Sequence, residues 1–184
     1  MKRIVLLAVM FSALTLAVVL AAGSRGLAQN DRTTDPRVKL GLQMAPVPLN
    51  LTGKDRNLVG LGSYIVNAQA GCNDCHTNPP FEEGGDPFLG QPKQVNAEAY
   101  LRGGVAFGPF VSRNLRPDAS GRPAGLRLEE FLLVMHTGVD LKHIPPAVPS
   151  PQVDLLQVMP WPVYGMMIDD DLRAVYEYLS ALPQ

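Results

Sequence analysis

The 184-residue sequence is poor in cysteine and histidine and carries no excess of basic charge. Its two cysteines stand at positions 72 and 75, and a disulfide between residues so close would constrain only a tiny loop and add little stability. The 16 basic and 17 acidic residues give a formal net charge of −1, and no basic cluster indicates nucleic acid or an anionic membrane surface as a partner. The sequence has no βαβ pattern, which argues against an α/β fold and against a thioredoxin-like dithiol.

Both cysteines belong to the stretch Gly71-Cys72-Asn73-Asp74-Cys75-His76. Cys-x-x-Cys-His is the attachment signature of a c-type haem. Two thiols at this spacing can each add to one vinyl group of the porphyrin, and the adjacent histidine can coordinate the iron. A zinc site would need two further ligands as a spaced pair, whereas His136 and His143 stand alone. The sequence therefore predicts one covalent haem c, bound through Cys72 and Cys75, with His76 as the proximal iron ligand.

The first 28 residues have the pattern of a targeting segment. Lys2 and Arg3 precede an apolar run over 4–22, and Gly26-Leu27-Ala28 is a small-residue cleavage site. The apolar run is almost long enough to span a bilayer, so a signal peptide and an uncleaved membrane anchor both remain open. Either alternative predicts a bacterial periplasmic location for the rest of the chain, tethered to the inner membrane in the second case. Without residues 1–28, the formal net charge is −4.

The remaining chain is expected to be one all-α domain that follows a tether. Residues 29–54 have little helical periodicity, and their prolines favour an extended segment that lies along the domain. Within the domain, 55–184, apolar stripes predict three main helices: 55–70, 126–137 and 169–182. A shorter helix is expected at 95–101, and long loops join these elements. Gly60 and Gly62 inside the first helix indicate a close helix crossing.

The axial ligand opposite His76 determines what a bound haem could do. The first candidate is Met159 in Val158-Met159-Pro160-Trp161-Pro162, because the prolines keep this segment extended and able to lie rigidly across a haem face. A thioether sulfur favours reduced iron, which suits an electron carrier. Met166 and Met167 are rival ligands, although apolar contacts at the entry to the last helix are the preferred interpretation of both.

Several polar and aromatic residues have more than one interpretation. His136 suits a cation at a helix end better than an iron ligand. His143 is either solvated or a second histidine ligand, and Trp161 is expected to pack beside the macrocycle. The triplet Ser112-Arg113-Asn114 could contact the haem propionates or Trp161, or could cap its own loop.

Taken together, these segments resemble the class I c-type cytochromes, in particular the single-haem domains of bacterial periplasmic respiratory chains. The resemblance covers about 58–182, and its remaining pieces are Gly62-Ser63-Tyr64-Ile65-Val66, Ser112 to Asp118, Leu128-Glu129-Glu130-Phe131, Thr137-Gly138, Met159 to Pro162, and Asp171 to Leu179. It implies a class I cytochrome c fold, in which the first and last helices cross nearly at right angles. Gly62 would then meet Tyr178, or Tyr176 in a shifted register.

The resemblance also implies the ligand set and shows two departures from the family pattern. Cys72 and Cys75 would be the thioether sites, with His76 and Met159 as the axial pair. Arg127 and Ile168 stand where similar sequences have a Thr or Ser N-cap. Capping of the last helix is expected to pass to Asp169, and no substitute for Arg127 is evident.

The expected function is electron transfer without catalysis of its own. The partners would be redox proteins, such as a periplasmic dehydrogenase, a reductase or a terminal oxidase. The chain would be either a free carrier or the cytochrome subunit of a respiratory dehydrogenase complex, with a membrane contact only if the leader is uncleaved. The alternative is a haem enzyme or gas sensor with an open sixth position, which would need a polar acid or base near Met159. The neighbouring sequence offers none.

Overall fold

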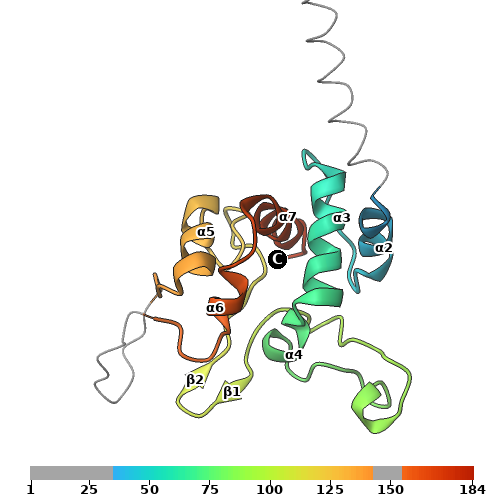
Figure 1. The fold of residues 1–184 in the computed structure, drawn as a ribbon. Helices are drawn as coiled ribbons and strands as arrows, with labels where there is room; N and C mark the ends of the chain where they lie inside the picture. Colours follow the sequence, from blue (N-terminus) through green and yellow to red (C-terminus); the bar gives the residue numbers. More distant parts are fainter. Residues whose placement is uncertain (1–34, 143–154) are drawn as a thin grey trace, which may run out of the picture. The chain divides into compact units, whose positions relative to one another are not determined.

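The computed structural model describes residues 35–142 and 155–184, and these residues are mostly helical (Figure 1). The chain divides into two units, 1–36 and 37–184, and nearly all described residues belong to the second. The elements are α2 (Pro36–Met44), α3 (Arg56–Tyr64), the π-helical turn η1 (Ile65–Gln69), α4 (Cys72–His76), the 3-10 turn η2 (Pro87–Leu89), β1 (Ala106–Phe107), β2 (Phe110–Val111), α5 (Leu128–Thr137), α6 (Trp161–Tyr164) and α7 (Asp169–Ser180). The short antiparallel hairpin β1–β2 was not expected in an all-α chain.

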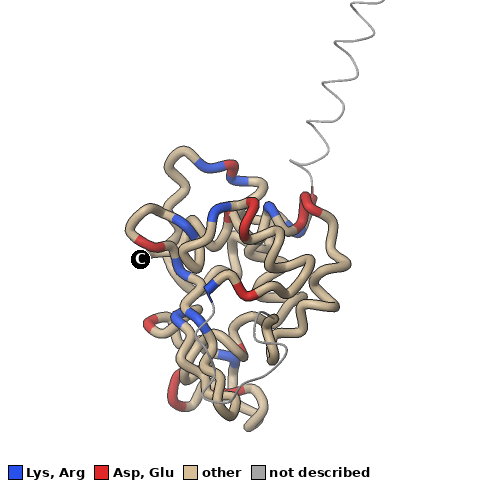
Figure 2. Tube along the Cα trace, turned by 90° about the vertical axis from the view of Figure 1, so that its left-hand side faces the viewer, with Lys and Arg blue, Asp and Glu red and all other residues tan. Residues whose placement is uncertain are grey.

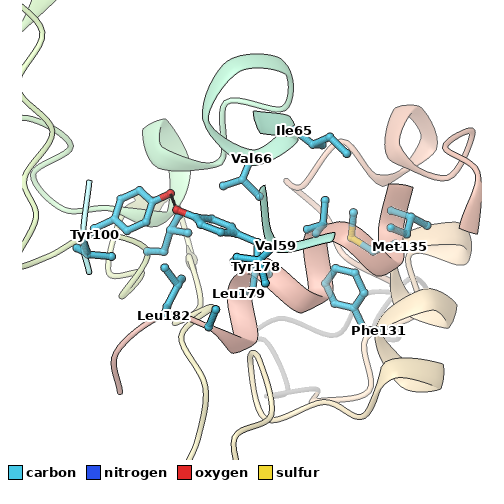
Figure 3. Close-up of a cluster of buried hydrophobic side chains, with 14 residues drawn as sticks. Val59, Ile65, Val66, Tyr100, Phe131, Met135, Tyr178, Leu179 and Leu182 are labelled. Atoms are coloured by element: carbon cyan, nitrogen blue, oxygen red, sulfur yellow. Dashed lines mark hydrogen bonds between the residues drawn. The ribbon is translucent and has the colours of Figure 1, made fainter. Parts of the chain in front are cut away.

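The core forms where α3 crosses α7. A Cβ atom on Gly62 would collide with the Ala174 carbonyl and lie 2.8 Å from Cβ of Tyr178, so the two backbones approach as closely as only glycine allows. In Figure 1, α3 runs up the view whereas α7 is seen nearly end-on. The contact expected between Gly62 and Tyr178 is therefore confirmed. Figure 3 shows the surrounding buried side chains, which include Val59, Val66, Phe131, Met135 and Leu179.

A closed ring of hydrogen bonds lies inside this core. The Tyr100 hydroxyl donates to Oδ1 of Asn67 at 2.7 Å, so Tyr178 is the donor in the 2.9 Å bond between the two phenols. Nδ2 of Asn67 completes the ring by donating to the Tyr178 oxygen at 3.2 Å. Burial raises the pKa of both tyrosines. Both are fully buried and point at one another in Figure 3, so the ring joins η1, α7 and the turns before Arg102.

The segment 29–54 contains a helix that its periodicity did not predict. A Cβ on Gly41 of α2 would collide with the Gly60 carbonyl, and the Ser63 hydroxyl donates to the Gly41 carbonyl at 2.7 Å. Close packing of two glycine-bearing helices therefore stabilises α2, although its own apolar stripe is weak. Between α2 and α3 the chain is non-helical, and the Asn50 amide donates to the Ala181 carbonyl at 2.8 Å.

The helix expected at 95–101 is absent, and turns take its place. Arg116 explains the difference, because its guanidinium binds the carbonyl oxygens of Tyr100 (2.7 Å), Ala97 (3.0 Å) and Glu98 (3.3 Å). These are acceptors that a continuing helix would need for its own ladder. Leu101 takes a left-handed conformation at φ 55° and donates its amide to the Thr77 hydroxyl at 2.9 Å.

The ends of the three main helices mostly agree with prediction. Asp55 caps α3 by accepting from the Asn57 amide at 2.8 Å. For α5, Glu130 supplies the cap that Arg127 lacks: its carboxylate accepts from the Arg127 amide at 2.8 Å. The prediction that Asp169 caps α7 is wrong. The N-cap of α7 is Ile168, with no side-chain bond, because the Asp169 carboxylate binds His136 instead.

Candidate functional site

The two cysteines and His76 share the five-residue helix α4. Gly71 precedes it in a left-handed conformation, φ 61°, which separates α4 from the π-helical turn before it. Both cysteines are free thiols; Cys72 is half-buried and Cys75 is exposed. Burial raises the pKa of Cys72 to about 12, and burial together with Asp74 raises that of Cys75. Both groups therefore stay protonated at neutral pH, unlike the acidic thiol of a redox dithiol.

His76 is fixed in one tautomer by a main-chain acceptor. Its Nδ1 lies 2.8 Å from the carbonyl oxygen of Arg113. A carbonyl can only accept, so Nδ1 carries the proton and Nε2 keeps its lone pair. Burial also lowers the pKa of His76, which favours the neutral ring. This is the state in which a histidine coordinates a metal, with its other nitrogen held by an outer hydrogen bond.

The loop after β2 holds that carbonyl in place. The Ser112 hydroxyl accepts from the Val105 amide at 2.9 Å, and Oδ1 of Asn114 accepts from the Arg116 amide at 2.8 Å. The Arg113 guanidinium binds the Asp140 carboxylate at 2.6 Å. Ser112 and Asn114 thus cap their loop. The contact between the Arg113 carbonyl and His76 was not predicted, because a main-chain acceptor has no residue-type signature.

The chain after Met159 is tied to the residues just before the cysteine motif. Met159 is half-buried and packs against the core cluster. Five residues later, the Tyr164 hydroxyl donates to the Ala70 carbonyl at 2.8 Å, two residues before Cys72. The extended, non-helical conformation expected for this segment is wrong from Trp161 onward, because Trp161–Tyr164 form the single turn α6. Pro162 is tolerated there, since amides of a first helical turn have no helical partner.

The rival methionines differ from each other. Met167 packs against the core cluster, as expected of an apolar contact. Met166 does not, because its side chain is 85% exposed. Trp161 is half-buried against Gly138, where a Cβ would collide with the indole.

His136 occupies the end of α5, as expected. Its Nδ1 lies 2.9 Å from the Gly165 carbonyl and its Nε2 lies 2.9 Å from Oδ1 of Asp169. Both ring nitrogens are engaged, which leaves no lone pair for a metal. His143 lies outside the described residues, as does the leader, 1–28. Within 35–142 and 155–184, no helix is long and apolar enough to cross a membrane.

The donor set fits a porphyrin held by the chain. It comprises two thiols on one short helix, one imidazole with a free Nε2, and the Met159 thioether, on the segment that the Tyr164 hydroxyl joins to Ala70. Exposed apolar side chains stand on β2, before Met159 and on α6: Val111, Val158 and Val163. In the described ranges, no group of three or more His, Cys, Asp or Glu gathers as a metal site. Lys, Arg, Asp and Glu are interspersed along the described trace (Figure 2).

Comparison with family models, with curated proteins and with solved structures found no match for this chain. Function is therefore inferred from the geometry and chemistry of this site.

Proposed function

We propose that this chain is an electron-transfer protein with one covalently attached haem c, a class I cytochrome c fold and His76–Met159 axial ligation. The observation that carries the proposal is the 2.8 Å bond from Nδ1 of His76 to the Arg113 carbonyl. It leaves Nε2 as the donor, on the same short helix as the only two cysteines. Haem would supply a one-electron couple at this place.

The residues have distinct roles in this proposal. Cys72 and Cys75 would be the thioether positions, and their one-turn helix fixes both relative to His76. The Arg113 carbonyl orients the imidazole and makes it a stronger donor. The Met159 sulfur would stabilise the reduced state and raise the potential. The bond from Tyr164 to Ala70 ties the Met159 segment to the motif.

Electron transfer is favoured over catalysis by the residues around Met159. Val158, Pro160, Trp161 and Pro162 offer no acid or base to move a proton. The partners would be redox proteins of the bacterial periplasm. N-terminal sequencing of the mature chain separates a free carrier, which would begin near Gln29, from a tethered subunit that retains the leader.

The test is to express the full chain with a haem-attachment system and to measure haem that stays bound after denaturation. One haem per chain is expected, and none in a Cys72→Ala, Cys75→Ala double variant. The ferric protein should show the weak long-wavelength band of sulfur-ligated haem. Met159→Ala should abolish this band, whereas the matched control Met166→Ala should keep it. Wild-type protein without covalent haem would refute the proposal, and rapid carbon monoxide binding to the ferrous form would favour the enzyme or sensor alternative.

A further inference from the structure

The end of α5 packs against the segment that connects Met159 to α7. The Trp161 indole lies against Gly138, the residue that ends α5 at φ 71°. Gly165 approaches so closely that a Cβ there would lie 2.8 Å from the His136 carbonyl oxygen. Between these contacts, the His136 ring reaches the Gly165 carbonyl and the Asp169 carboxylate, each at 2.9 Å. One side chain therefore joins α5, the end of α6 and the start of α7.

The two acceptors require two donors on the ring. A carbonyl oxygen and a carboxylate oxygen both carry lone pairs and no proton. A neutral imidazole has one N–H, so it can donate to only one of the two oxygens. Its other ring nitrogen would then face the second oxygen lone pair to lone pair, which is repulsive. The imidazolium donates to both. The three-element contact is therefore complete only when His136 is protonated.

The surroundings favour that protonated form. The Gly165 carbonyl, followed by the Asp169 carboxylate, raises the pKa of His136. The ring also stands in the last turn of α5, where the helix dipole favours a cation. The charged groups on the packed elements are Asp169, Asp170 and Asp171 in the first turn of α7, Arg173 and Glu177 further along that helix, and Glu129 and Glu130 at the opposite end of α5. The stretch 161–168 has no charged residue.

A short series of hydrogen bonds connects this contact to Met159. Gly165, which binds the ring through its carbonyl, donates its amide to the Trp161 carbonyl at 2.7 Å. Trp161 donates its own amide to the Met159 carbonyl at 2.7 Å. The position of the methionine backbone is thus linked through two residues to the ring of His136.

We propose that His136 is a positioning residue for Met159, and that its imidazolium form clamps the segment that presents the methionine sulfur. Loss of the proton removes one of the two bonds and loosens that segment. The inference rests on the proposed function for the role of Met159. It makes sulfur ligation of the haem, and with it the reduction potential, dependent on a single proton.

The experiment is a pH titration of the haem-loaded protein from about pH 5 to about pH 9, across the range in which histidine changes charge. The long-wavelength band and the reduction potential are measured beside the NMR shift of the His136 ring protons. Wild type should lose band intensity and potential in a one-proton step with the same midpoint as the ring-proton shift. Asp169→Asn should move that midpoint down by about half a pH unit, the scale of one exposed charge pair. Asp171→Asn removes a charge from the same turn and is the control, with no comparable shift.

Two substitutions of His136 separate positioning from simple packing. His136→Arg stays charged at every pH and should keep the band without the step. His136→Gln offers no imidazolium and should show a weak band without the step. A wild-type band that persists while His136 titrates, or a step with an unchanged midpoint in His136→Arg, would overturn the clamp and leave the electron-transfer proposal standing. A band absent at every pH would overturn Met159 ligation and the clamp together.

Discussion

Replacing Gly62 with alanine tests the helix crossing that supports the cysteine motif. At an exposed position inside a helix, alanine is more favourable than glycine by about 1 kcal/mol. Here the new Cβ would collide with the Ala174 carbonyl and lie 2.8 Å from Cβ of Tyr178. A backbone carbonyl in a buried helix cannot rotate away, so the cost lies at or above the upper end of the roughly 1–3 kcal/mol typical of overpacking. The expected net loss is about 2 kcal/mol of unfolding free energy, a large share of the ~5–15 kcal/mol that keeps a domain folded.

The assay is guanidinium unfolding of the haem-loaded protein, followed by far-ultraviolet circular dichroism. Gly60→Ala is the matched comparison, because it adds the same methyl group two positions away in α3. Its Cβ would meet α2, at 2.6 Å from the Val38 carbonyl oxygen and 2.8 Å from the Val38 side chain. Since α2 is a nine-residue helix outside the α3–α7 crossing, it can shift, and a smaller loss is expected. Equal losses in both variants, or a more stable Gly62→Ala protein, would refute the steric reasoning.

Four further predictions address other contacts. Tyr178→Phe removes two bonds of the buried ring and should cost about 2 kcal/mol by denaturant unfolding, at about 1 kcal/mol per bond, whereas Tyr64→Phe in α3 should change stability far less. Arg116→Met removes three hydrogen bonds to carbonyl oxygens and should cost about 3 kcal/mol in the same assay; a loss below about 1 kcal/mol would contradict the role given to Arg116. Gly138→Ala puts a side chain at a φ of 71° and into the Trp161 indole. The fluorescence of Trp161, the single tryptophan, should therefore shift to the red, and an unchanged spectrum would count against that contact. Because the folded pKa of His136 is raised, its stabilising effect should be full below its unfolded pKa near 6.5 and fade as pH rises through the folded value, so wild type and His136→Gln should converge in melting temperature at high pH.

Local sequence signals predicted the elements that depend on local chemistry. The stripes of α3, α5 and α7, the Asp55 cap and the left-handed Gly138 follow from helix periodicity and end signals. The meeting of Gly62 with Tyr178 came from the resemblance to a family, because periodicity alone cannot pair two helices.

The errors occur where distant groups decide local structure. At 95–101 the sequence favours a helix, yet the Arg116 guanidinium takes the carbonyls that this helix would need. In α2 the deciding contact is with Gly60, far along the chain. At the site, the motif Cys-x-x-Cys-His was enough to single out Cys72, Cys75 and His76 as candidate residues. The Arg113 carbonyl was not, since any residue could supply it.

The π-helical turn η1 determines how far α4 is rotated about the helix axis relative to the face of α3 that crosses α7. Its wider winding is marked by the 2.8 Å bond from the Ala70 amide to the Ile65 carbonyl, five residues back. Gly62 faces α7 before this turn, and α4 begins just after it. Each residue of a helix advances its direction by about 100°, so one residue added or removed between Ile65 and Gln69 would swing α4 by about that angle. His76 would then point away from the Arg113 carbonyl. The number of residues between crossing and motif is therefore as much a part of the site as the residues themselves.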